Sequence, residues 1–402
     1  MDTLLKRNRF VIHKRTAIAL LFGCSIIGGL LLAEGVARLL PERLFEQTGN
    51  PKGDPLLGSP VQNVDVSNDF PEDPKPADVY RIVVLGDSHT VSVKNELSFP
   101  EVLERLLNND HAAGRKRVEV YNGGGLGHSP YQYYLYLKSR LTKYQPDLVV
   151  VALHIGNDFL DLYRNDDRPS LWFDGREFVH KDPEFFKFDD PNRTGIFRSS
   201  RVLHLAQSLF RDSVGYQWSR VRVLWTVGRQ SGEGVGAAAN YLYTITRGYF
   251  VNQHIFRQSM NQILFLKRFP RVQADLDRAN RRTIELTKAV AQENGMRLLY
   301  VPIVTKLQVE PESDRVVIDK TLALCGFDRS ALKLEDDLTE SLISLLDGYQ
   351  LDSLRVRDAL VEAARKGVLY DETYHINEQA HAIIGRALYQ KVNPMLTQPS
   401  PR

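Results

Sequence analysis

Apolar runs of strand length recur in two separated parts of the chain. The runs at 81–86, 117–121 and 147–155 are rich in β-branched residues, and a fourth follows much later at 297–304. A short, continuously apolar run of this kind is typical of a strand that is buried on both faces, as in a parallel sheet. The sequence therefore predicts four buried strands.

Helix-forming stretches separate these runs. Ser98 with Glu101, and Ser129 with Gln132, have the Ser-x-x-Glu/Gln form of a capping box, which begins a helix. Further helices are expected at 275–294, near 356–366 and at 377–392. Because strands alternate with helices, the expected fold is α/β, a parallel sheet covered by helices on both faces.

The N-terminus combines basic residues with an uncharged apolar run. Residues 1–15 hold five Lys and Arg residues, and residues 16–33 contain no charge. Such a run is just long enough to span a bilayer as a helix, and basic residues before a single span keep that end in the cytoplasm. We therefore expect a single-pass membrane protein with a cytoplasmic tail (1–15), a transmembrane anchor (16–40), a Pro-, Gly-, Asn- and Asp-rich linker (41–78) and an extracytoplasmic domain (79–402), periplasmic if the cell is Gram-negative.

Two alternatives to an uncleaved anchor are weaker. Gly35-Val36-Ala37 offers small residues at which a signal peptide can be cleaved, but the apolar run is longer than a usual signal core. Leu21-Phe22-Gly23-Cys24 weakly resembles a lipoprotein site, yet the sequence stays apolar after Cys24. A helix buried inside a soluble protein is disfavoured by the basic flank.

Composition and charge exclude several classes of protein. The chain has 402 residues, 43% of them hydrophobic and 25% charged, which is ordinary for one or two globular units. Residues 1–40 hold six basic and two acidic residues, so the remaining chain has 46 basic and 47 acidic residues and a net charge of −1. The net charge of +3 thus comes from the basic N-terminal segment and not from a basic surface of the remaining chain, so no nucleic-acid partner is expected. Cys24 and Cys325 cannot build a disulfide framework.

Residues with catalytic chemistry follow the predicted strands. Ser88, in Gly-Asp-Ser, comes directly after the first strand, a glycine-rich stretch at 122–127 follows the second, Asn157 follows the third, and His375 precedes the last helix. The carboxyl ends of parallel strands meet at one edge of a sheet, where open α/β folds bind their ligands. A serine at that edge becomes a nucleophile when a base removes its proton, and glycine N–H groups and an amide can hold an oxyanion.

These four blocks, in this order, resemble the SGNH (GDSL-type) hydrolase family. The resemblance covers about 79–159 and 275–392, and the surroundings of Tyr131-Gln132 and of 146–149 are similar to membrane-anchored members. It implies a three-layer α/β/α, flavodoxin-like parallel sheet and an acyl-enzyme mechanism that needs no metal and no organic cofactor. The roles it implies are Ser88 as nucleophile, His375 as base, and the N–H of Ser88, the N–H of Gly124 and the side chain of Asn157 as oxyanion donors.

The chain departs from the family at the acidic member of the triad. The family usually has Asp three residues before the histidine, where this sequence has Glu372, with Asp371 one residue earlier. Either carboxylate can accept the imidazole N–H, because the Glu side chain is about one methylene longer. Register favours Glu372.

Other interpretations of the same residues are less specific. The glycines of 123–127 follow the second strand and lack the acidic partner of a dinucleotide-binding loop. His89, His128 and His154 flank the proposed site but lie on separate loops without an HExxH motif or a carboxylate cluster. They are expected to be loop or supporting residues rather than metal ligands.

Residues 160–272 interrupt the alternation of strands and helices with Asp- and Arg-rich loops. They are interpreted as an insertion that caps the active-site face. Its aromatic residues are expected to pack the insertion itself, the alternative being that they hold a sugar ring or an acyl chain; they are Tyr241, Tyr243, Tyr249 and Phe250.

The leading hypothesis is a membrane-anchored serine esterase that hydrolyses O-acetyl or other short acyl esters, with an acylated carbohydrate as one candidate substrate. One alternative is an O-acyltransferase, in which a sugar hydroxyl of an envelope or exported polysaccharide resolves the same acyl-enzyme. An alternative of another class is a non-catalytic carbohydrate-binding or assembly scaffold. A binder has no physical need for nucleophile, glycine, amide and histidine together, which argues against the last. The sequence leaves the oligomeric state open.

Overall fold

The computed structural model describes residues 75–91, 97–109, 116–162, 171–173, 178–180 and 253–397, with short helical pieces between 21 and 39, among them 32–36, and between 234 and 240. One compact unit comprises residues 53–187 and 219–402, and the other comprises residues 1–52 and 188–218. Within the described residues, no helix has both the length and the hydropathy that crossing a membrane requires. Much of the predicted anchor (16–40) and nearly all of the predicted linker (41–78) lie outside the described residues.

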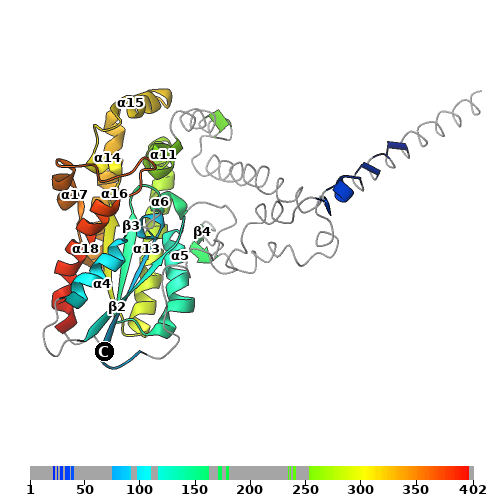
Figure 1. Cartoon of the computed structure of the whole chain (residues 1–402). Coiled ribbons are helices and arrows are strands. Elements are labelled where there is room, and N and C mark those ends of the chain that lie inside the picture. The colour runs from blue at the N-terminus through cyan, green and yellow to red at the C-terminus, as the bar shows by residue number, and fades with distance from the viewer. Residues whose placement is uncertain are drawn as a thin grey trace, which may run out of the picture. The chain divides into compact units, whose positions relative to one another are not determined.

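The core of the larger unit is a five-stranded parallel sheet in the order β2-β1-β3-β6-β7 (Figure 1). The strands are β1 (Val79–Gly86), β2 (Arg117–Gly124), β3 (Leu148–His154), β6 (Arg297–Ile303) and β7 (Asp352–Ser353). The prediction of four buried strands is confirmed by β1, β2, β3 and β6, and β7 is a short fifth strand that was not predicted. This order is that of flavodoxin-like sheets, which bind ligands where the order reverses beside the first strand.

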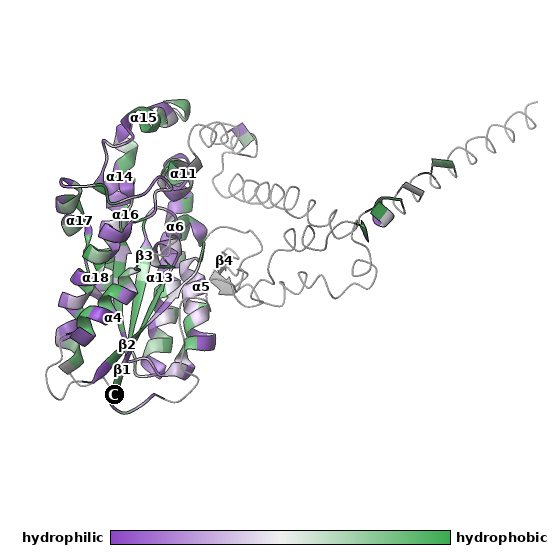
Figure 2. Ribbon diagram, in the orientation of Figure 1, coloured by the Kyte–Doolittle hydropathy of each residue, from purple (hydrophilic) through white to green (hydrophobic). Residues whose placement is uncertain are grey.

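Helices cover both faces of the sheet, which confirms the expected three layers. Side chains of β1 alternate between two apolar clusters, with Ile82 and Val84 in one and Val83 and Leu85 in the other, all fully buried. The run is therefore continuously apolar because both of its faces are covered, and the strands form the hydrophobic centre in Figure 2. One layer contains α4 (Phe99–Asn109), α17 (Arg357–Ala364) and α18 (Glu378–Val392), and the other α5 (Pro130–Tyr136), α12 (Asn261–Arg268), α13 (Pro270–Glu293) and α16 (Lys333–Gly348).

Local hydrogen bonds explain where the helices begin. The backbone N–H of Ser98 donates to Glu101 Oε2 at 2.7 Å, and the N–H of Ser129 donates to Gln132 Oε1 at 2.8 Å. The predicted capping box is thus present at the start of α5, whereas at α4 the Glu101 carboxylate accepts both the N–H and the hydroxyl of Ser98, at 2.7 Å each. The side chain of Asn377 caps α18.

The C-terminal end of the predicted insertion belongs to the helical layer. Ile263, Leu264, Phe269 and Val272 are fully buried in the same cluster as α5 and α13. Nearly all of 181–252, including the aromatic residues of that stretch, lies outside the described residues. The remaining described elements are α3 (Ser88–Val91), η2 (Leu137–Leu141), η3 (Thr142–Tyr144), α6 (Asp158–Asp161), the hairpin of β4 (Leu171–Phe173) and β5 (Phe178–His180), α11 (Gln253–Ile255), η6 (Phe256–Met260), α14 (Lys306–Val309), α15 (Arg315–Leu324), η7 (Arg329–Leu332) and η8 (Asn393–Thr397).

Candidate active site

Ser88 stands where β1 turns into α3. The turn requires glycine at position 86, because a Cβ there would lie 2.0 Å from Thr90 Oγ1. Asp87 is buried, and its Oδ1 accepts the N–H of His89 at 2.9 Å, which fixes the first turn of the helix. Ser88 itself is half-buried, and its backbone N–H donates to none of the described residues. The turn thus presents the hydroxyl and the N–H of Ser88 at the carboxyl edge of the sheet.

His375 reaches Ser88 although 287 positions separate them in the sequence. The distance from Ser88 Oγ to His375 Nε2 is 2.9 Å, which suits a general base and its nucleophile. His375 lies on the loop between α17 and α18, directly after Tyr374, whose φ of 67° is in the left-handed region. A non-glycine residue there costs on the order of 1–3 kcal/mol and is found most often at functional sites. Burial of the Tyr374 side chain contributes to offsetting this cost.

The ionisation state of His375 suits a base. Burial lowers the pKa of His375, and the nearby carboxylates of Asp87 and Asp371 oppose this shift. Because the pKa falls below its usual value near 6.5, the imidazole is neutral at neutral pH and can accept the proton of Ser88.

Asp371 reaches the other nitrogen of the base through a hydroxyl group. Thr373 Oγ1 lies 2.8 Å from His375 Nδ1 and donates to Asp371 Oδ1 at 2.7 Å. Asp371 Oδ1 also accepts the backbone N–H of Thr373 at 2.7 Å and that of His375 at 3.1 Å. Glu372, which register favours, is exposed. The geometry therefore favours Asp371 over Glu372, since the loop turns the carboxylate four residues before the histidine toward it.

Asn157 lies at the start of α6, after β3, with its side chain held by His154. The distance from His154 Nδ1 to Asn157 Oδ1 is 2.8 Å. Burial lowers the pKa of His154 to about 3, so its neutral ring donates Nδ1–H to the amide oxygen and orients the Asn157 NH₂ group. Asp158 has a structural role, because its Oδ2 accepts the N–H of His154 at 2.9 Å and the hydroxyl of Tyr133 at 3.0 Å.

The N–H of Gly124, the second expected oxyanion donor, is engaged elsewhere. It donates to Asn122 Oδ1 at 3.0 Å, and the Asn122 amide donates in turn to the carbonyl of Thr90 at 2.9 Å. An oxyanion would have to displace the Asn122 oxygen to use this donor. The role of Gly124 in this structure is to tie the end of β2 to the helix that carries Ser88.

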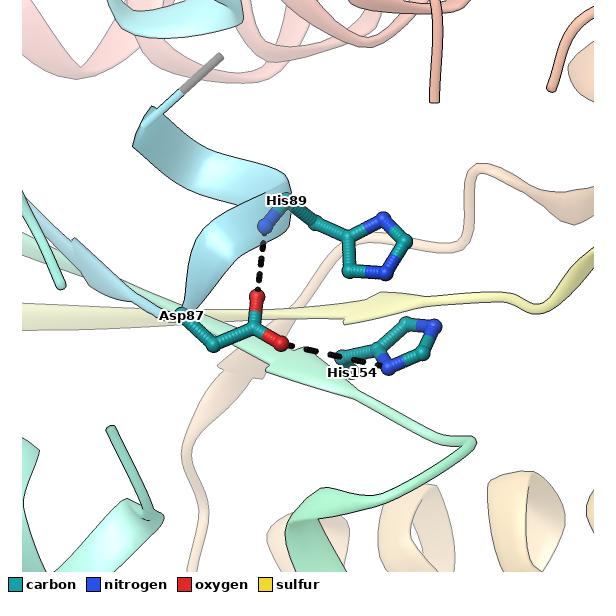
Figure 3. A group of neighbouring side chains, drawn as sticks. All are labelled: Asp87, His89 and His154. Carbon is teal, nitrogen blue, oxygen red and sulfur yellow. Dashed lines mark hydrogen bonds and ion pairs between the residues drawn. The ribbon is translucent and has the colours of Figure 1, made fainter. Parts of the chain in front are cut away.

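Three buried side chains behind the nucleophile have the composition of a metal site but not its geometry. Asp87, His89 and His154 offer ligand atoms that all lie within 4.8 Å of one another (Figure 3). A metal ion bound to an imidazole lies in the ring plane, about 2.0–2.1 Å from the nitrogen. The His89 and His154 rings are stacked, with centroids 3.8 Å apart and an interplanar angle of 22°. Planes so nearly parallel intersect much farther from the rings than a metal–nitrogen bond extends, so one ion cannot lie in both ring planes. This stack is suited to supporting the site and not to chelation.

Gln258 is a site residue that sequence reasoning does not find. Its side chain lies between His375 and His89, with 3.2 Å from Gln258 Nε2 to His375 Nε2 and 3.2 Å from Gln258 Oε1 to His89 Nε2. It belongs to η6, within the stretch interpreted as an insertion, and stands in no recognisable motif. A π-helical turn is a frequent companion of functional sites, but it becomes visible only in the structure.

Comparisons with known proteins give only distant structural neighbours. No protein-family model and no curated protein matches the sequence. A crystal structure of an acetylxylan esterase from Geobacillus stearothermophilus matches at 10% identity over 80% of this chain and 96% of that chain, with a TM-score of 0.37. The acetyl xylan esterase AlAXEase matches at 10% identity over 78% and 99%, with a TM-score of 0.38. LAE5, an alpha/beta hydrolase enzyme from a lake metagenome, matches at 11% identity over 79% and 97%, with a TM-score of 0.36. Similarity at this level carries no conclusion about the reaction of this chain.

Proposed function

We propose that this chain is an SGNH-type serine esterase. The observation that supports this most strongly is the continuous set of contacts from Ser88 Oγ through His375 and Thr373 to Asp371. Each contact has the donor and acceptor that the reaction needs: the serine O–H donates to Nε2, Nδ1–H donates to the threonine oxygen, and the threonine O–H donates to the carboxylate.

The reaction then proceeds in two halves. Ser88 Oγ attacks the ester carbonyl carbon while its proton passes to His375 Nε2, and the resulting oxyanion is held by the Ser88 N–H and the Asn157 amide. The imidazolium gives this proton to the departing alcohol as the C–O bond breaks, which leaves an acyl group on Ser88. Water, deprotonated by His375, attacks that acyl group and releases the carboxylic acid and the free serine.

The setting and the acceptor are part of the same proposal. The basic tail and the apolar run of residues 16–33 favour attachment to a membrane with the esterase domain on the extracytoplasmic side. The expected substrates carry acetyl or other short acyl groups. Transfer of the acyl group to a sugar hydroxyl in place of water is the alternative outcome, since both share one acyl-enzyme.

Ester turnover by the full-length chain in detergent tests the proposal. The substrates are p-nitrophenyl esters of increasing acyl length and acetylated sugars, and the variant is Ser88→Ala. Loss of the nucleophile is expected to lower kcat/KM about a thousandfold or more. The matched control is Ser139→Ala, which removes an exposed hydroxyl whose one bond within the described residues is to the Leu135 carbonyl. No turnover by the wild-type chain on any substrate, or equal rates for wild type and Ser88→Ala, would refute the esterase. Mass spectrometry of added sugar acceptors separates hydrolysis from transfer.

A further inference from the structure

The side-chain amide of Gln258 lies between two imidazoles of the site. Its Nε2 lies 3.2 Å from His375 Nε2, the same nitrogen that faces Ser88, and its Oε1 lies 3.2 Å from His89 Nε2. The His89 and His375 ring centroids are 4.8 Å apart. Gln258 thus contacts the base directly at its reactive nitrogen.

The protons in this contact follow from the chemistry of the groups. An amide NH₂ only donates, so His375 Nε2 must accept, and the amide oxygen must accept Nε2–H from His89. Burial lowers the pKa of His89 well below its usual value, so His89 is neutral and carries one N–H. His89 Nδ1 has no partner among the described residues, which agrees with a proton on Nε2. Only this orientation of the amide leaves His375 Nε2 free of a proton and able to act as a base.

The backbone around Gln258 is held close to the sheet edge. A Cβ at Gly156 would lie 1.8 Å from the Gln258 carbonyl oxygen, so only glycine before Asn157 permits this approach. The hydroxyl of the next residue, Ser259, bonds to the buried carboxyl group of Glu335. The Gln258 backbone is therefore held by its close approach to Gly156 and by the bond from the adjacent Ser259 to Glu335.

We propose that Gln258 is a positioning residue that keeps His375 neutral, with its Nε2 lone pair facing Ser88, and that His89 holds Gln258 in the orientation this requires. The inference rests on the proposed function, because it concerns the same base. It assigns a role in the site to the π-helical turn at the end of the stretch 160–272.

The contact affects both the uptake and the release of a proton by His375. Nε2 has one lone pair, for which Ser88 at 2.9 Å and Gln258 at 3.2 Å compete. Once His375 is protonated, its Nε2–H faces the N–H of the amide, and this repulsion makes the imidazolium a stronger acid. A stronger acid passes its proton more readily to the departing alcohol.

Removal of the Gln258 donor should raise the pKa of His375, because a hydrogen bond donated to the neutral form disfavours the charged form. The other groups that influence His375 remain in every variant, so differences between variants report position 258. Those groups are the carboxylates of Asp87 and Asp371, which raise its pKa, and the neighbouring histidines His89, His154, His254 and His381.

Titration of His375 by ¹⁵N NMR in the full-length, histidine-labelled chain tests the proposal, with the signal assigned by its loss in His375→Asn. Gln258→Met keeps the length of the side chain and removes the donor, and it should raise the pKa of His375 by about half a unit to one unit. Gln258→Glu replaces the donor by a carboxylate, and it should raise the pKa by more than about one unit. Gln379→Met, an exposed control on α18 four residues after His375, should leave it unchanged. The low-pH limb of kcat/KM should follow the same order.

A merely structural role for Gln258 does not produce this order. The proposal is overturned if both Gln258 variants titrate like the wild type, or if Gln258→Glu lowers the pKa of His375. The NMR measurement needs no turnover, so the two hypotheses can fail separately. The predicted order in a chain that hydrolyses no ester would support the role of Gln258 and refute the esterase, whereas ester hydrolysis with an unchanged titration would do the reverse.

Discussion

The path from Asp371 to His375 allows a quantitative test of which residues complete the triad. Asp371→Asn removes the charge, Thr373→Val removes the hydroxyl while keeping the branched shape, and Glu372→Gln changes the exposed carboxylate. In the structure the first two belong to one chain of hydrogen bonds to Nδ1, with distances of 2.7 Å and 2.8 Å. Asp371→Asn and Thr373→Val should therefore impair the same hydrogen-bonded path to His375, whereas Glu372→Gln should leave that path intact.

The expected size of the effect follows from the bonds that are lost. A hydrogen bond to a charged group contributes about 1.5–3 kcal/mol, and the chain becomes charge-assisted when His375 is protonated in the transition state. Since about 1.4 kcal/mol corresponds to a tenfold change in rate, Thr373→Val should lower kcat/KM about 10- to 150-fold. Asp371→Asn should lower it at least as much, and Glu372→Gln should stay near the wild-type value.

The pH dependence of activity provides a second test, because the direction in which the pKa of His375 shifts differs between variants. Asp371 raises the pKa of His375, so Asp371→Asn should lower that pKa. Activity requires the neutral imidazole and is lost as the pH falls through its pKa. The acid-side loss should therefore move to lower pH in Asp371→Asn, opposite to the shift expected for Gln258→Met.

Steady-state hydrolysis of p-nitrophenyl acetate by the single variants and by Asp371→Asn/Thr373→Val provides the measurement. Members of one relay are non-additive, so the double variant should lose little more than the worse single variant. Losses that multiply in the double variant, or a Glu372→Gln loss as large as that of Asp371→Asn, would show that the relay is not the acidic member of the triad.

Three further outcomes test the surroundings of the site. Gly156→Ala should displace the Gln258 backbone, whose oxygen lies 1.8 Å from the added Cβ, and so raise the acid-limb pKa of kcat/KM as Gln258→Met does; an unchanged profile contradicts the contact. His154→Phe removes the 2.8 Å bond that orients Asn157 and should lower kcat about 10- to 100-fold with little change in KM, which a selective KM effect would contradict. Burial raises the pKa of Glu335 to about 7 from 4.5, so between these pH values the folded chain holds a proton that the unfolded chain has lost. The free energy of unfolding should therefore fall by up to about 3 kcal/mol as the pH rises from 4.5 to 7. Urea unfolding should show this fall in the wild type and not in Glu335→Gln, and an equal fall in both would contradict it.

Local patterns in the sequence determined the framework of the protein. Four apolar runs predicted the four main strands because strands covered on both faces need apolar residues at every position, as in Val83 and Val84. The two Ser-x-x-Glu/Gln patterns marked the starts of α4 and α5, since each forms a hydrogen bond between residues three apart. The approach of Ser88 to His375 followed from the rule that parallel strands end at one edge, together with the family resemblance.

Only the tertiary structure decided the contacts made by loops. Register pointed to Glu372, but the loop places Tyr374 in a left-handed conformation and links Asp371 to His375 through Thr373. Spacing along a chain does not encode such a turn, because side-chain direction depends on backbone angles that the neighbouring packing imposes.

The same limit applies to Gln258 and Gly124. No local pattern marks Gln258, which reaches the base only because a helical turn more than 100 residues away in the chain packs against a glycine of the sheet edge. The glycine-rich stretch predicted backbone N–H groups near Ser88, but in the structure the N–H of Gly124 donates to the side chain of Asn122. Strands and caps are set by neighbours in sequence, whereas donors and acceptors at the site are set by long-range packing, which is why the first were predictable and the second were not.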